Sequence, residues 1–135
     1  KYKKVSCGGK CLNNIGTKVS DKLLFQKQFK FGISFENSST HGYVTEKILD
    51  TFSSNSIPIY YGSPNIEEYF NPQTFINGHK FKNYDELIEY IKKIDNNEDL
   101  YKSYFNKPIL SEKWQKILSD PKETYFRNIA KKIYD

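Results

Sequence analysis

The chain has 135 residues, which is enough for one compact domain, and 16% of them are aromatic, which argues against a disordered protein. No apolar run is long enough to cross a bilayer, so the sequence predicts no transmembrane segment. The net charge is +5, and residues 1–30 hold eight Lys and one Asp. This basic third suits a phosphate-bearing ligand, an acidic partner domain or a nucleic acid, and a solvated lysine surface is an equally good interpretation.

The chain holds one Arg, Arg127, and two cysteines, Cys7 and Cys11. Arg is the residue preferred for bidentate contacts with bases and phosphates, so nucleic-acid recognition is only weakly supported. The CGGKC spacing lacks the further Cys or His ligands that a zinc site needs. We therefore predict free thiols in a reducing compartment, with a local disulfide as the alternative, and no metal site.

The first predicted element is a strand over Tyr2–Ser6, followed by a loop that ends near Gly16. Because the chain begins so close to this strand, we expect a piece of a longer protein, with a natural short domain as the alternative. Asp21 is a suitable cap for a helix that reaches about Phe29.

The stretch from Phe31 to Gly62 predicts a strand, a polar loop, a helix and a second strand. Residues 31–35 are rich in β-formers, and Val44, Ile48, Leu49 and Phe52 recur at helical spacing. Residues 57–60 read as a buried strand. Such a β-α-β unit belongs in a parallel sheet.

After Gly62 the helical pattern dominates. Ser63 followed by Pro64 is a helix-start signal, and Asn83 with Glu86 forms a capping box. The predicted elements are a helix over 65–69, a turn at 71–72, a strand over 75–77, helices over 83–94 and 98–105, and a last helix opened by Asp120, Pro121 and Glu123. Alternating strands and helices predict an α/β domain of three layers with a parallel sheet and extra C-terminal helices.

Ligands of open α/β sheets bind outside the carboxyl ends of the strands, and here that edge carries polar residues. Lys47 in the first turn of a helix opposes the helix dipole, which is expected where the charge meets a bound phosphate. Glu46 fits the dipole and is equally explained as a helix-start residue. Asn37 is either a ligand contact or a turn former, and Tyr43 either stacks on a ring or fills the core. Gly42 is expected to adopt a backbone conformation closed to other residues.

Three blocks, FENSSTHGYVTEKI, IPIYYG and FNPQTFI, occur in this order. Together they resemble the donor-binding half of α-1,3/α-1,4-fucosyltransferases, especially the bacterial members. The resemblance extends from about Tyr2 to Leu110, and GGKCLNNIG is similar to the loop that introduces the same domain.

The resemblance implies the C-terminal half of a two-domain GT-B glycosyltransferase. Residues 1–110 would form a Rossmann-like domain that binds GDP-fucose, and residues 111–135 a helical extension. The enzyme would transfer L-fucose, with inversion, to an N-acetylglucosamine-type glycan acceptor, such as that of a lipopolysaccharide or a glycoprotein. The acceptor domain, which supplies the general base, is missing from this sequence, so we expect no catalytic residue here and no activity of the chain alone. The resemblance implies no required cofactor beside the donor substrate GDP-fucose, and the sequence shows no cluster of metal ligands.

Carried over residue by residue, the resemblance assigns donor contacts to Asn37, Tyr43, Glu46 and Lys47. Lys47 would pair with the diphosphate, while Glu46 would bind the fucose and stabilise its oxocarbenium charge.

Two positions depart from the family. Leu12 stands where many bacterial members have an Arg that helps to hold the diphosphate, which leaves Lys10 as the nearby cation. Tyr61 stands where the family often has Trp.

Two other functions stay open. A GT-B enzyme for another nucleotide sugar would bind UDP rather than GDP, and a non-catalytic basic module would bind polyanions in a salt-sensitive way. A bacterial enzyme is expected in the cytoplasm, peripheral to the inner membrane, and a eukaryotic one in the Golgi lumen.

Overall fold

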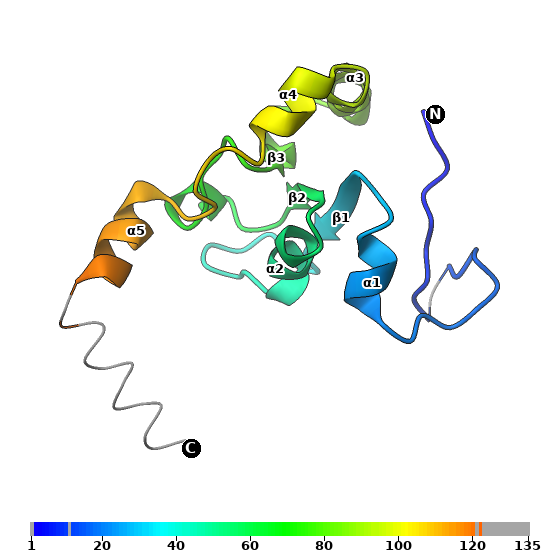
Figure 1. Cartoon of the computed structure of the whole chain (residues 1–135), viewed down its shortest axis with the longest axis horizontal. Helices are drawn as coiled ribbons and strands as arrows, with labels where there is room; N and C mark the ends of the chain where they lie inside the picture. The colour runs from blue at the N-terminus through cyan, green and yellow to red at the C-terminus, as the bar shows by residue number, and fades with distance from the viewer. Residues whose placement is uncertain (1, 11, 121, 123–135) are drawn as a thin grey trace.

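The computed structural model describes residues 2–10, 12–120 and 122. Three strands lie between helices, with an irregular N-terminal segment on one side and a separate helix on the other (Figure 1). In chain order the elements are α1 (Lys22–Gln26), β1 (Phe31–Phe35), α2 (Glu46–Ser53), β2 (Ile57–Tyr61), the short 3-10 helix η1 (Ile66–Glu68), β3 (Ile76–Asn77), the 3-10 helix η2 (Gly78–Lys80), α3 (Tyr84–Asp95), α4 (Glu98–Ser103) and α5 (Glu112–Ser119). None of the described helices is long and apolar enough to span a membrane.

The strands form one parallel sheet in the order β1-β2-β3. β1 pairs with β2 along its whole length, with Ile33 opposite Ile59, and β2 pairs with β3 through Ile59 and Tyr60. Because α2 connects β1 to β2, the predicted β-α-β unit is confirmed. The three strands point the same way, so the loops that follow them meet at one edge of the sheet.

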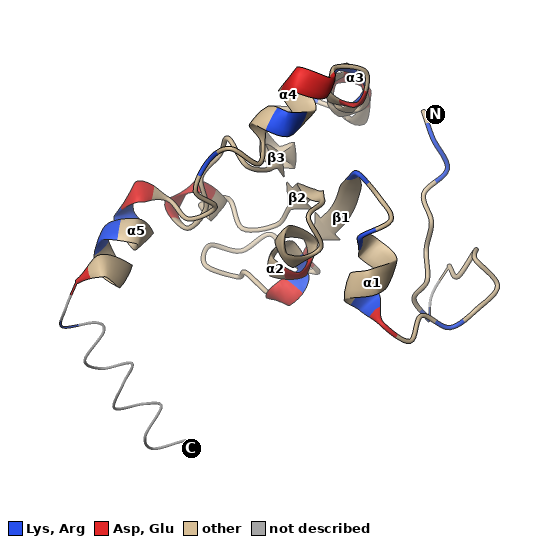
Figure 2. Cartoon of the chain, viewed as in Figure 1, with Lys and Arg blue, Asp and Glu red and all other residues tan. Residues whose placement is uncertain are grey.

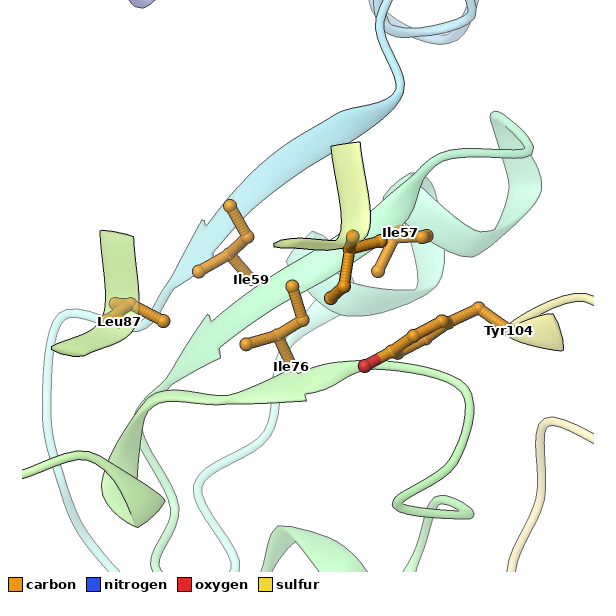
Figure 3. Close-up of a cluster of buried hydrophobic side chains, with 6 residues drawn as sticks. Ile57, Ile59, Ile76, Leu87 and Tyr104 are labelled. Atoms are coloured by element: carbon orange, nitrogen blue, oxygen red, sulfur yellow. The ribbon is translucent and has the colours of Figure 1, made fainter. Parts of the chain in front are cut away.

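Side chains of β2 alternate between the two faces of the sheet, and different helices cover each face. Ile57 and Ile59 point toward α3 and α4 (Figure 3), whereas Tyr60 points toward α2 and η1. The first core cluster consists of Ile57, Ile59, Ile76, Leu87, Ile94 and Tyr104. The second consists of Ile48, Tyr60, Ile66, Phe70 and Phe75. The predicted three-layer architecture is therefore confirmed.

Helix α2 lies close against β1 because Gly32 has no side chain. A Cβ atom at Gly32 would lie 2.6 Å from Cγ2 of Thr51. The buried hydroxyls of Ser34 and Thr51 lie 2.8 Å apart, and both face the carbonyl oxygen of Lys47. These contacts fix the rotation of α2 on the sheet and thereby the direction of its first turn.

The helix starts predicted at Asp21 and Asn83 are confirmed. Asp21 accepts a hydrogen bond from the N–H of Leu24 at 2.9 Å and caps α1. Asn83 accepts from the N–H of Glu86 at 2.9 Å, while the Glu86 carboxylate binds the N–H of Lys82 instead of that of Asn83. Such oxygens satisfy free N–H groups of the first turn without help from distant residues.

The strand predicted over Tyr2–Ser6 is wrong, because this segment is irregular. Side chains rather than a backbone ladder attach it to the rest of the protein. The Tyr2 hydroxyl donates to Asp95 at 2.7 Å, and the Lys3 ammonium contacts the same carboxylate. Residues with β propensity form a strand only where a neighbouring strand pairs with them.

The short helix predicted over 65–69 forms only as the 3-10 helix η1, and the cap predicted at Ser63 is wrong. The Ser63 hydroxyl accepts from the N–H of Gly42 at 3.0 Å and donates to Asn65 Oδ1 at 2.6 Å. Asn65 Oδ1 also accepts from Gly42, and Asn65 makes no cap bond. Ser63, the predicted cap, is therefore bound to the loop that precedes α2, and so is Asn65.

Two helices are shorter than predicted, and one helix forms that was not predicted. α1 ends at Gln26 rather than near Phe29, α4 ends at Ser103 rather than at residue 105, and α5 was not predicted separately.

Trp114 of α5 stacks on Tyr69 with ring centroids 6.1 Å apart, and its indole nitrogen is buried without a partner among the described residues. The last predicted helix and Cys11 lie outside the described residues, so that helix, the free thiols and the boundary at residue 110 stay predictions.

Asp95 at the C-terminal end of α3 holds the N-terminal part of the chain. Besides Tyr2 and Lys3, it binds the Lys30 ammonium at 3.1 Å. Its side chain is only 7% exposed, whereas the two lysines are largely in solvent. The hydrogen bonds from Lys3 and then Tyr2 hold the pKa of Asp95 well below its usual value.

We predict that Asp95→Asn lowers the melting temperature at pH 7 and that its difference from the unaltered chain vanishes in acid. A carboxylate whose pKa is lowered by folding stabilises the protein above its unfolded pKa of about 3.9, and the contribution is lost as the pH falls through the lower folded value. The exposed lysines keep the effect small. Thermal unfolding from pH 7 to below pH 4 measures it, with Asp99→Asn as the control; a difference that is constant with pH contradicts the assignment.

Candidate functional site

The loop of residues 36–45, between β1 and α2, forms the carboxyl edge of the sheet at β1. Gly42 has a φ of +76°, which confirms the conformation expected for it. Its N–H is bound by Ser63, and the Ser39 hydroxyl donates to the carbonyl oxygen of Gly62 at 2.9 Å. The loop after β2 thus holds the loop before α2, and the polar side chains at this edge have defined positions.

The ammonium group of Lys47 lies over the end of β1. It donates to the carbonyl oxygen of Phe35 at 2.9 Å and to Oδ1 of Asn37 at 3.0 Å. Because an ammonium only donates, the amide oxygen of Asn37 faces Lys47 and its NH₂ group is turned away. Two of the three N–H bonds of Lys47 are therefore used within the protein, and one is left.

Glu36 is the buried acidic residue of the site, with a fully covered side chain. Its Oε1 accepts from the backbone N–H of Thr45 at 2.8 Å, and its Oε2 accepts from the Thr45 hydroxyl at 2.7 Å. Oε2 lies 3.7 Å from Nζ of Lys47, which is an ion pair but too long for a hydrogen bond. Glu36 therefore fixes the first turn of α2 and places a negative charge beneath Lys47.

Glu46 and Tyr43 are exposed at the same edge. Glu46 is the first residue of α2, and its side chain has no hydrogen bond or ion pair to another described residue. Tyr43 is 41% exposed. Acidic and basic residues lie side by side at the start of α2 (Figure 2). The structure thus brings Asn37, Tyr43, Glu46 and Lys47 together around one helix start.

Lys10 is not brought to this group by any contact among the described residues. It is exposed in the irregular segment before α1 (Figure 1), and its ammonium has no described partner. Leu12, which replaces the family's Arg, is 87% exposed and has a φ of +55°.

An aromatic row, consisting of Phe35, Tyr61 and His79, lines the same edge and was not predicted. The Phe35 and Tyr61 rings lie 6.0 Å apart, and Tyr61 stacks on His79 at 4.3 Å. Nε2 of His79 lies 2.8 Å from the carbonyl oxygen of Gly62. Phe35 and Tyr61 are register partners of β1 and β2, but the second strand was predicted to end at residue 60, which left Tyr61 without a predicted partner.

The arrangement offers hydrogen-bond donors and positive charge to an anion. The donors are the remaining N–H of Lys47 and the NH₂ of Asn37, at the positive end of the α2 dipole. Thr45, which caps α2 at 3.5 Å from the N–H of Lys47, was missed as a site residue although a Thr before a helical stripe is a recognisable cap. No group of three or more metal-ligating side chains occurs in the described part of the chain.

Comparison with known proteins agrees with this geometry. Residues 1–127 match the family described as glycosyltransferase family 10 (fucosyltransferase) C-term. The chain is 47% identical over 97 residues to the alpha-(1,3)-fucosyltransferase FucT of Helicobacter pylori. The aligned region covers 72% of this chain and 20% of that protein. It is 40% identical over 95 residues to the mouse 4-galactosyl-N-acetylglucosaminide 3-alpha-L-fucosyltransferase 9, which covers 67% of the chain and 26% of that protein.

A crystal structure of an alpha1,3-fucosyltransferase with GDP-fucose superposes with a TM-score of 0.72 at 45% identity, over 74% of this chain and 30% of that one. The expected Rossmann-like α/β fold, of the kind that forms half of a GT-B enzyme, is thereby confirmed. The chain spans less than a third of the length of each of these relatives. It belongs to the glycosyltransferase family 10 fucosyltransferases and corresponds to the C-terminal part of that family.

Proposed function

We propose that this chain binds GDP-fucose at the carboxyl edge of β1 and serves as the donor-binding domain of an α-1,3-fucosyltransferase. The observation that carries the proposal is the Lys47 ammonium, held by two internal acceptors at the start of α2 with one N–H left over. Such a group needs little reorganisation to receive a diphosphate oxygen. The GDP-fucose in the similar crystal structure supports the choice of ligand.

Each predicted site residue takes a role in this proposal. Lys47 neutralises the diphosphate, which becomes the leaving group, and Asn37 donates from its NH₂ group. Glu46, exposed and unpaired among the described residues, accepts hydrogen bonds from the fucose and stabilises its positive charge in the transition state. Tyr43 packs on the donor, and Lys10 supplies a second cation only if the segment before α1 approaches the site.

Transfer of fucose also requires groups that we propose lie outside this chain. Inverting transfer needs a general base beside the acceptor hydroxyl. At this edge Glu36 is committed to Thr45 and Glu46 to the donor. The base and the acceptor site therefore belong to the other half of the GT-B enzyme, which also selects the N-acetylglucosamine-type acceptor.

GDP is expected to stabilise the chain against thermal unfolding. A ligand at a hundredfold excess over its Kd adds about 2.7 kcal/mol, which raises the melting temperature by several degrees. UDP at the same concentration is expected to leave it unchanged, which separates this enzyme from one that uses a uridine nucleotide. An unchanged melting temperature with saturating GDP, in a sample shown to be folded, refutes the proposal.

Two substitutions separate the roles of Lys47 and Glu46. Lys47→Ala is expected to weaken both GDP and GDP-fucose, because both carry the diphosphate, by the roughly 1.5–3 kcal/mol of a charged hydrogen bond. Glu46→Ala is expected to weaken GDP-fucose alone, because only the sugar is contacted. Calorimetric titration measures both. Lys102→Ala and Glu112→Ala, an exposed lysine and another first-turn glutamate, are the matched controls. Equal losses of both ligands in Glu46→Ala would remove its assignment to the sugar.

Residues 1–135 alone are expected to bind GDP-fucose without transferring fucose, because neither Glu36 nor Glu46, the carboxylates of the β1–α2 junction, is left to act as the base. A radiochemical assay with an N-acetyllactosamine-type acceptor tests this expectation, and the full-length enzyme of a relative serves as the positive control. Turnover by the isolated chain would show that the base lies within it, with Glu36 as the first candidate.

A further inference from the structure

We propose that Glu36 is a counter-charge that lowers the affinity of Lys47 for a bound anion, and so sets how tightly the site holds a diphosphate. The inference rests on the proposed function, because it takes GDP as the ligand of Lys47. It concerns a residue that contacts neither the sugar nor the phosphates and acts through Lys47.

Burial makes the Glu36 charge effective. The Glu36 side chain is completely covered, whereas 29% of the Lys47 side chain is exposed toward the edge of the sheet. A charge that no water reaches is screened little by the solvent or by salt. The two carboxylate oxygens are held in place by the N–H and the hydroxyl of Thr45, at 2.8 and 2.7 Å.

Glu36 acts on Lys47 by charge and not by orientation. The direction of the ammonium is set by its bonds to Phe35 O and Asn37 Oδ1, at 2.9 and 3.0 Å. Glu36 Oε2, at 3.7 Å, is outside hydrogen-bond distance and is already bound by the Thr45 hydroxyl. Removal of the carboxylate charge therefore leaves Lys47 pointing in the same direction.

The sign of the effect follows from Coulomb's law. A phosphate oxygen bound to Lys47 at about 2.8 Å lies no more than about 6.5 Å from Glu36 Oε2, which is 3.7 Å from the same nitrogen. At this separation, in the partly buried surroundings of a protein surface, a carboxylate repels an anion enough to change its affinity about tenfold. Glu36 and Lys47 are together neutral before a ligand binds. GDP therefore binds less tightly than to a lone lysine, which favours release of the nucleotide after transfer.

Glu36→Gln tests the proposal, because the glutamine amide keeps hydrogen bonds to both Thr45 groups while removing the charge. We expect calorimetric titration of the 135-residue chain to show GDP binding about tenfold more tightly to this variant, with slower dissociation. Loss of a merely structural contact would weaken binding or leave it unchanged, so the direction of the change decides between the two roles.

Three controls complete the experiment. Thr45→Val breaks the bond to Glu36 but keeps the charge, and Glu89→Gln removes an exposed carboxylate on α3; neither is expected to tighten GDP. Lys47→Met is expected to weaken GDP at least tenfold, which checks the proposed function separately.

Weaker or unchanged GDP binding in Glu36→Gln overturns the inference while the proposed function stands. Tighter GDP binding in Thr45→Val, which keeps the carboxylate, overturns it as well. No GDP binding by the unaltered chain, or full binding by Lys47→Met, overturns the proposed function and the inference with it. If Glu36→Gln does not fold, Glu36→Met combined with Thr45→Val replaces both side chains by apolar groups of similar size, and the same tightening is required of it.

Discussion

Strand β2 is the element on which both hydrophobic cores depend, because its side chains enter the two helical layers in turn. Ile57 and Ile59 anchor α3 and α4, while Tyr60 anchors α2 and η1. The same strand reaches the site through one polar atom: the buried Tyr60 hydroxyl accepts from the N–H of Ser63 at 2.9 Å. Burial raises the pKa of Tyr60, so this hydroxyl stays protonated. Core packing and the position of the Ser63 hydroxyl are therefore linked.

From Ser63 the constraint passes to the loop before α2 and then to Lys47. Ser63 holds Gly42, and Glu36 holds Thr45 at the other end of the loop. The first turn of α2 is thus fixed from the sheet side by Gly32 and Thr51 and from the loop side by buried hydrogen bonds. A binding group supported in this way loses little freedom when a ligand arrives. The proposed site is a property of the β-α-β unit as a whole rather than of Asn37, Tyr43, Glu46 and Lys47 alone.

Sequence reasoning succeeded where the deciding interaction is local. The helical stripe of α2 and the caps at Asp21 and Asn83 depend on neighbours a few residues away, and all of them formed. The predicted strands β1 and β2 also formed, because each pairs with the other. Sequence reasoning failed where a residue with a good local signal is engaged by a distant one. Ser63, the predicted cap, binds Gly42 instead of capping a helix.

For the candidate site, the grouping of the residues could be predicted from the sequence, whereas their contacts could not. The grouping of Asn37, Tyr43, Glu46 and Lys47 follows from their place at one strand end and one helix start. Their interactions do not, because the burial of Glu36 depends on which side of the loop packs inward. The carbonyl oxygen of Phe35, which holds Lys47, carries no sequence signal at all, since every residue has one.

The contact between α5 and η1 gives this protein a built-in optical reporter. Trp114 is the single tryptophan of the chain, and it lies on Tyr69 with its indole nitrogen covered. Its emission therefore originates from one place, a pocket that is also lined by Val44 of the loop before α2. Detachment of α5 would expose the indole to water and shift the emission to longer wavelength. The far-ultraviolet circular dichroism would meanwhile follow the helices and the sheet as a whole. Comparison of the two signals during unfolding would reveal whether the C-terminal helix separates before the sheet opens.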